Sequence, residues 1–94
     1  MARTIIGGFL EDIPKQILAA KGYLLNNDAP SLYRHAHTIK GAAAAVGGAR
    51  LREAAFEMEK AGKAGDLCLA AEILPRVEED FRILEETMRK TGWA

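Results

Sequence analysis

Residues 28–48 read DAPSLYRHAHTIKGAAAAVGG, and this stretch predicts one amphipathic helix with a signal at each end. Asp28 can cap the first turn, where amide donors are unpaired, and Pro30 is tolerated there for the same reason. Gly47 or Gly48 can adopt the left-handed conformation that ends a helix. At about 100° of rotation per residue, one apolar stripe collects Leu32, Ala36, Ile39, Ala43 and Val46.

The segment that precedes this helix has the same three-four spacing of apolar residues. The apolar residues with this spacing are Ile6, Phe9, Ile13, Ile17, Ala20 and Leu24. Gly7-Gly8 and Pro14 interrupt the front of the segment, because glycine and proline are poor residues for a helix interior. We therefore expect a short turn or extra helix at the N-terminal end and a firm helix from about Pro14.

Two further helices are expected after Gly48. The first packs through Leu51, Ala54, Ala55 and Met58 and is expected to end at Gly62. Asp66 can cap the second, whose apolar residues are Leu67, Ala70, Leu74, Val77, Phe81, Leu84 and Met88. Pro75 removes a backbone donor within this last segment, so we expect a kink or a split near Leu74.

The breaks between these segments are short, and no segment shows the alternation of a strand. They are Asn26-Asn27-Asp28, Gly47-Gly48 and Gly62 to Asp66. Connections of this length make neighbouring helices antiparallel. The sequence thus predicts an all-α fold, an up-down-up-down antiparallel four-helix bundle, in a single domain over 1–94 with its core at about 9–90.

Composition excludes several classes of function. The 94 residues carry a formal net charge of zero, whereas nucleic-acid binding needs a concentrated basic surface. No apolar run approaches the roughly 20 residues that cross a bilayer, and the first ten residues do not resemble a secretory signal. The lone Cys68 excludes an internal disulfide and fits a reducing compartment. We expect a cytoplasmic monomer without membrane insertion, and the role of Trp93 stays open.

The face of the 28–48 helix that points away from the core has an unusual composition. His37 lies roughly 150° from the centre of the apolar stripe. Lys40, Gly41 and Ala44 share its face, and Tyr33 and Arg34 stand on the turn before it. Glycine in a helix interior costs about 1 kcal/mol relative to alanine, so its presence on an exposed face suggests that a partner must approach closely there.

The segment His37-Thr-Ile-Lys40-Gly41-Ala-Ala-Ala-Ala-Val46-Gly47 resembles the histidine-containing phosphotransfer (HPt) domains of bacterial multistep phosphorelays. Their motif is a histidine, Lys-Gly three and four residues later, a run of small residues, and a glycine ten residues after the histidine. The resemblance runs from about Phe9 to about Met88. It departs from the family in two places, because Ala42 to Ala45 lack the Ser or Asn often found there and Pro75 lies inside the last helix.

The resemblance implies a role for each residue on this face. His37 would accept a phosphoryl group from a receiver-domain aspartate, since a histidine is neutral and nucleophilic near pH 7. Lys40, expected to face solvent as a mobile charge, would neutralise phosphoryl oxygens, and Gly41 would leave clearance for the partner. Tyr33, Arg34 and Ala44 are the expected partner-binding residues. His35 lies on the edge of the apolar stripe, where a partly buried, hydrogen-bonded histidine is expected.

The resemblance also implies partners and cofactors. The partners would be response-regulator receiver domains and a sensor histidine kinase. Magnesium would belong to the receiver, so we expect no cofactor, metal or autonomous catalysis in this chain.

Three alternatives remain open at this stage. A dimerising kinase domain is disfavoured, because Thr38 follows the histidine where that family has an acidic residue, and no proline follows before Pro75. A helical interaction module without phosphotransfer would fit a chain that lacked His37 or Lys40. The phosphoryl-accepting module of a chemotaxis-type histidine kinase shares both motif and fold, and the sequence separates it poorly.

Overall fold

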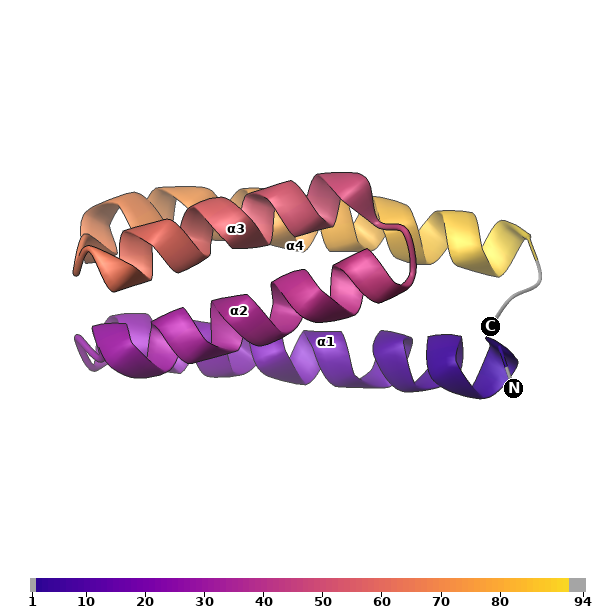
Figure 1. Cartoon of the computed structure of the whole chain (residues 1–94), viewed down its shortest axis with the longest axis horizontal. Helices are drawn as coiled ribbons and strands as arrows, with labels where there is room; N and C mark the ends of the chain where they lie inside the picture. The colour runs from indigo at the N-terminus through magenta and orange to yellow at the C-terminus, as the bar shows by residue number, and fades with distance from the viewer. Residues whose placement is uncertain (1, 92–94) are drawn as a thin grey trace.

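The computed structural model describes residues 2–91, which form four helices joined by short connections (Figure 1). They are α1 (Ala2–Leu25), α2 (Ala29–Ala45), α3 (Ala49–Lys63) and α4 (Leu67–Lys90). Trp93 lies outside the described residues. No helix among them is both long enough and apolar enough to span a bilayer.

The three connections share one geometry. Each contains a residue with positive φ, namely Asn27 at 53°, Gly47 at 74° and Gly65 at 73°. The next amide, of Asp28, Gly48 or Asp66, donates a 2.8 Å hydrogen bond to the carbonyl five residues earlier. This pattern is the Schellman motif, which satisfies the last carbonyls of a helix.

The residue after each left-handed position begins the next helix. Asp28 Oδ1 accepts from the amide of Ser31 at 3.2 Å, and Asp66 Oδ1 accepts from the amide of Leu69 at 3.1 Å. Both aspartates are therefore N-caps, as the sequence predicts. Because one helix ends and the next begins within three residues, successive helices reverse direction.

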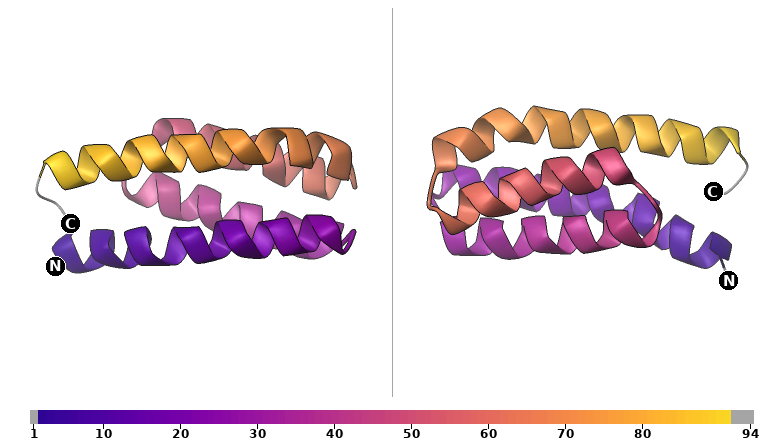
Figure 2. Two further views of the ribbon diagram at one scale, coloured as in Figure 1. Left: turned by 180° about the vertical axis from the view of Figure 1, so that it is seen from behind. Right: turned by 45° about the horizontal axis from the view of Figure 1, so that its top comes forward.

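The helices pack in the order of a closed up-down-up-down bundle. Contacts join α1 to α2, α2 to α3, α3 to α4, and α4 back to α1. The views in Figure 2 agree with this order, and the start of α1 and the end of α4 lie at the same end of the bundle. The largest fully buried side chains come from all four helices: Ile13, Leu32, Ile39, Leu51, Met58 and Val77. The predicted four-helix bundle is confirmed.

The expectation of a separate N-terminal turn is wrong, because α1 continues through Gly7-Gly8 and Pro14. A proline inside a helix costs about 3 kcal/mol. Phe9, Leu10, Ile13 and Ile17 are all buried on either side of it, and each contributes about 1.5–3 kcal/mol. Pro14 itself is exposed, so its ring takes no space in the core.

Two further expectations concern the interior of α4 and the end of α3. Helix α4 is not split at Pro75, which is exposed while Leu74 and Val77 beside it are buried in the core. Helix α3 passes through Gly62 and ends at Lys63, and Gly65 supplies the left-handed residue instead. Gly62 is buried against α2, so its role is in packing between helices.

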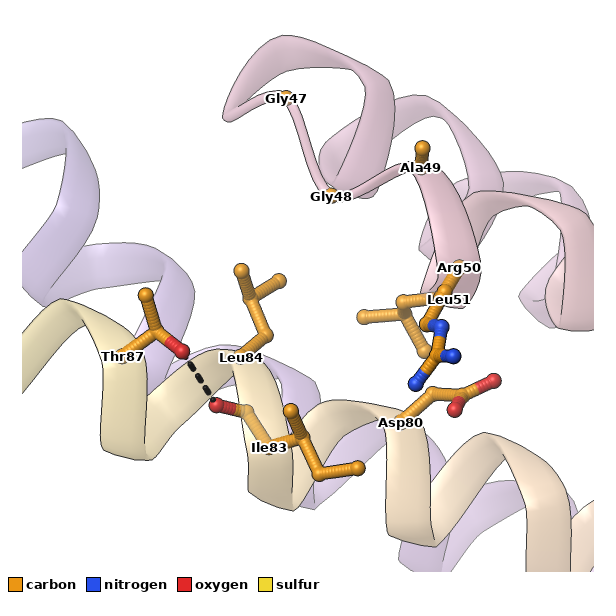
Figure 3. A pocket seen from close by; sticks show the side chains of 9 residues that line it. All are labelled: Gly47, Gly48, Ala49, Arg50, Leu51, Asp80, Ile83, Leu84 and Thr87. Atoms are coloured by element: carbon orange, nitrogen blue, oxygen red, sulfur yellow. Dashed lines mark hydrogen bonds between the residues drawn. The ribbon is translucent and has the colours of Figure 1, made fainter.

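A hollow of about 210 Å³ lies where the α2–α3 turn meets α4 (Figure 3). Its lining includes the apolar side chains of Leu51, Ile83 and Leu84, and the Thr87 hydroxyl in it donates to the carbonyl of Ile83 in its own helix. A Cβ on Gly48 would lie 2.7 Å from Leu84 Cδ2, so the glycine allows the turn to close on α4. We attribute the hollow to this packing; it lies about 15 Å along the helix from His37.

Candidate functional site

His37 projects from the middle of α2 into solvent. Its side chain is 64% exposed, and Gly41 and Ala44 on the following turns are exposed as well. A Cβ placed on Gly41 would meet no atom of another helix within 4 Å, so packing among residues 2–91 does not require glycine there. The outward position of the imidazole and the open surface beside it agree with the sequence analysis.

A carboxylate of the neighbouring helix forms a hydrogen bond with the imidazole on its buried side. His37 Nδ1 lies 2.8 Å from Oε2 of Glu59, which is on α3. The side chain of Glu59 is only 9% exposed. An exposed ring thus rests on a buried acceptor, which restricts both its rotation and its protonation pattern.

Lys40 completes the contact with the second carboxylate oxygen. Its Nζ lies 2.7 Å from Glu59 Oε1, an ion pair whose angle is not that of a well-formed hydrogen bond. The Lys40 side chain is 27% exposed, so the expectation of a lysine free in solvent is wrong. Lys40 is drawn inward because the buried carboxylate needs a counter-charge.

Glu59 is ionised in this setting. Burial raises the pKa of its carboxyl, but the contacts with Lys40 and His37 outweigh burial, and the net effect holds the pKa below its ordinary value of 4.5. An ionised carboxylate can only accept hydrogen bonds. His37 Nδ1 must therefore be the donor, and in the neutral ring Nε2 is left with a free lone pair.

Sequence reasoning missed Glu59 as a site residue. It follows Ala55 by four residues and Leu51 by eight, so it falls within the buried stripe of α3. A carboxylate in an apolar stripe requires a partner, because an isolated buried charge is costly. The carboxylate of Glu59 within the apolar stripe was therefore the signal that the sequence offered. Its partners on α2 could not be identified, because the sequence does not show how α2 and α3 align.

The predicted partner-binding residues before His37 occupy different environments. Tyr33 is half-buried, and its backbone lies against Gly62 of α3. Arg34 is exposed and donates to Ser31 Oγ at 3.2 Å. Within the described residues neither forms a hydrogen bond or ion pair with His37.

His35 links α2 to α1 through hydrogen bonds at both of its ring nitrogens. Its Nδ1 lies 2.6 Å from Gln16 Oε1, and its Nε2 lies 3.1 Å from the Tyr23 hydroxyl, both on α1. The ring is half-buried, as expected for a histidine hydrogen-bonded inside the bundle. Both of its nitrogens are occupied, whereas His37 has one nitrogen facing solvent.

No three His, Cys, Asp or Glu side chains group as metal ligands in the part of the chain that the structure describes.

Comparison with protein families gives a match to the Hpt domain model over residues 4–87. No curated protein matches the chain. The family match covers the four helices almost completely and includes His37, Lys40, Gly41 and Glu59. On this match and the four-helix bundle, the chain belongs to the Hpt domain family, whose members carry out phosphotransfer in two-component signalling.

Proposed function

We propose that this chain is a phosphorelay intermediate whose phosphoryl group is carried on Nε2 of His37. It accepts the group from the aspartyl phosphate of one receiver domain and passes it to another. The observation that supports this most directly is the 2.8 Å contact between the exposed His37 ring and the buried Glu59 carboxylate. That contact leaves Nε2, and not Nδ1, available to an approaching partner.

The transfer step follows from the protonation state of the ring. The Nε2 lone pair attacks phosphorus, the N–P bond forms, and the bond from phosphorus to the aspartate oxygen breaks with its electron pair remaining on the carboxylate. Because Nδ1 keeps its proton, the phosphorylated ring carries a formal positive charge. Glu59 lies beside that proton and offsets the charge. Its carboxylate is thus already in place to stabilise the positively charged phosphohistidine.

Lys40 and Gly41 assist in different ways. Phosphoryl transfer requires mainly positioning and neutralisation of the equatorial oxygens. Lys40 is one turn from His37, and its ammonium lies beside the same carboxylate, from which it can reach outward to a phosphoryl group. Gly41 keeps the surface next to Nε2 low, so that the partner's loops can approach.

The partners of Hpt domains are receiver domains and kinases in general. For this chain we propose two receivers, with magnesium and the acceptor aspartate supplied by the receiver. The chain would need no metal, nucleotide or base of its own, because His37 and its neighbours supply the nucleophile and the counter-charge. We propose a monomer that works in the cytoplasm.

The test is transfer from phosphorylated receiver domains of the same genome to the purified chain. We expect rapid labelling of the wild-type chain and none of His37→Gln, since the substitution removes the nucleophile. NMR of the labelled protein should locate the phosphoryl group on Nε2. Circular dichroism should report the same helix content in both proteins.

His35→Gln is the matched control, because it removes the other histidine of the same helix. Labelling should persist in this variant. Labelling that persists in His37→Gln, or that appears on His35, would contradict the assignment. Labelling of the wild type by a kinase and ATP but by no receiver would instead support the chemotaxis-type alternative.

A further inference from the structure

An exposed aromatic residue lies next to the His37 site on the neighbouring helix. Phe56 of α3 is 45% exposed, although a phenylalanine usually gains by burial. Lys40 Nζ lies 4.9 Å from the centroid of its ring, and Lys60 Nζ lies 4.6 Å from it. Both distances are typical of cation–π contacts. Lys40 therefore connects the ring to Glu59 and to His37.

Basic side chains flank Phe56 on α3. At about 100° per residue, the exposed sector of α3 next to Glu59 contains Arg52, Phe56, Lys60 and Lys63. The other acidic residues of α3, Glu53 and Glu57, lie further round and, with Arg76, line a hollow against α4. Glu57 also forms an ion pair with Arg76 there. We call the surface formed by Arg52, Phe56, Lys60 and Lys63 the cationic rim.

We propose that Phe56 is the residue that anchors the receiver domain while the phosphoryl group passes to or from His37. This inference rests on the function proposed above. The partner's approaching face carries an acyl phosphate and the carboxylates that hold its metal, so it is anionic. The cationic rim complements that charge, and complementary charges raise the rate of encounter.

The aromatic ring supplies the contact that the lysines cannot. Lysines are solvated and flexible, and they are depleted at the centres of interfaces. A rigid ring with two side-chain torsions loses little entropy when it is covered, and a few such residues usually dominate the binding energy. The two ammonium groups restrict the Phe56 ring before the partner arrives.

The experiment measures the rate of transfer from a phosphorylated receiver to the chain at increasing receiver concentration. We expect Phe56→Ala to raise the half-saturating receiver concentration about tenfold and to leave the rate at saturation almost unchanged. Leu18→Ala is the matched control, because Leu18 of α1 is 69% exposed and lines a hollow between α1 and α4, away from the cationic rim. Equal half-saturating concentrations in the two variants would overturn the proposal.

A charge reversal gives an independent test. It keeps the proposal testable even if Phe56→Ala does not fold. Lys60→Glu should weaken docking, and the difference from the wild type should shrink as salt is raised. Lys15→Glu, at an exposed position of α1, should have no such effect. If the two reversals behave alike, the cationic rim does not guide the receiver.

A small phosphoryl donor separates docking from chemistry. Phosphoramidate should label His37 equally in the wild type and in Phe56→Ala, because no protein surface is needed. A lower rate with phosphoramidate in Phe56→Ala would show that the ring acts through Lys40 on His37, and would overturn the anchoring role. If no receiver labels the wild type at all, the proposed function fails, and the anchoring role fails with it.

Discussion

At the scale of single residues, Glu59 determines what His37 can do. Placing a carboxylate in the interior is costly unless opposite charges and hydrogen bonds compensate it. Lys40 Nζ lies 2.7 Å from one carboxylate oxygen of Glu59 and His37 Nδ1 lies 2.8 Å from the other, and these two groups provide that compensation. The contact with His37 also determines which imidazole nitrogen carries the proton, and the proposed phosphoryl transfer depends on that choice.

This arrangement predicts a specific dependence of stability on pH. The pKa of Glu59 is lower in the folded protein than its ordinary value of 4.5, so the unfolded chain binds the proton more tightly. The contribution of Glu59 to stability is therefore complete above pH 4.5 and is lost as the pH falls through the lower pKa of the folded state. Relative to Glu59→Gln, the unfolding free energy of the wild type should decrease over this range. Urea unfolding, followed by circular dichroism from pH 7 to pH 3, measures it.

Glu53→Gln provides the comparison, because Glu53 is exposed on the same helix and lies outside the site. It corrects for the loss of one carboxylate from the surface. A difference between wild type and Glu59→Gln that stays constant from pH 7 to pH 3 would contradict the ionised, paired state of Glu59.

At the scale of the element, α2 has two faces with separate tasks. Leu32, Ala36, Ile39 and Ala43 are buried and hold the helix in the bundle. The opposite face has His37, followed by Gly41 and Ala44, which are exposed and small. A helix with longer side chains on that face would be as well packed, so the small residues serve the surface and not the core.

Gly41→Leu separates these two tasks. The unfolding free energy should rise by about 0.5–1 kcal/mol, because leucine is a better helix former than glycine and the position is open. Transfer from a receiver should nevertheless slow about tenfold or more, a loss of about 1.4 kcal/mol, because the new side chain occupies the approach to Nε2. Thermal unfolding and the transfer assay measure the two effects.

Gly22→Leu in α1 is the matched variant, since Gly22 also has no atom within 4 Å of an added Cβ. It should give a similar gain in stability and leave transfer unchanged. Normal transfer in Gly41→Leu would remove the clearance argument.

At the scale of the whole molecule, the site depends on how closely α2 and α3 approach. Glu59 reaches His37 from a different helix, 22 positions away in the sequence. Gly62, one turn after Glu59, lies against the backbone of Tyr33, and an added Cβ would be 3.1 Å from Tyr33 N and Cα. The missing side chain thus lets the two helices pack closely next to the site.

Gly62→Leu should therefore damage both the bundle and the site. Overpacking a buried position costs about 1–3 kcal/mol, and the backbone of α2 cannot move aside cheaply. Separation of the helices should also weaken the His37–Glu59 hydrogen bond, which the Nδ1 proton signal in NMR reports. Gly22→Leu again serves as the control. Unchanged stability and an unchanged proton signal would show that the close approach at Gly62 is not required.

The sequence by itself determined the helices, most of their ends and the outward face of α2. These features are local: a cap, a left-handed glycine and an apolar stripe act over a few residues. The His37-Lys40-Gly41 motif was recognisable for the same reason, and His35 could be assigned to the bundle from its angle on the helix. No partner helix was needed for any of these inferences.

The tertiary structure alone decided the continuity of α1 and α4 and the identity of the group beneath His37. Local rules predicted an interruption by Gly7-Gly8 and Pro14 and a kink or a split near Leu74. Neither helix is divided there, because burial of the neighbouring core residues outweighs the cost of a proline. The helix angle of Lys40 predicted a side chain in solvent, but in the bundle Glu59 of α3 draws the ammonium inward. The axial alignment of α2 against α3 comes from side-chain packing across the whole bundle, and that alignment brings Glu59 beneath His37.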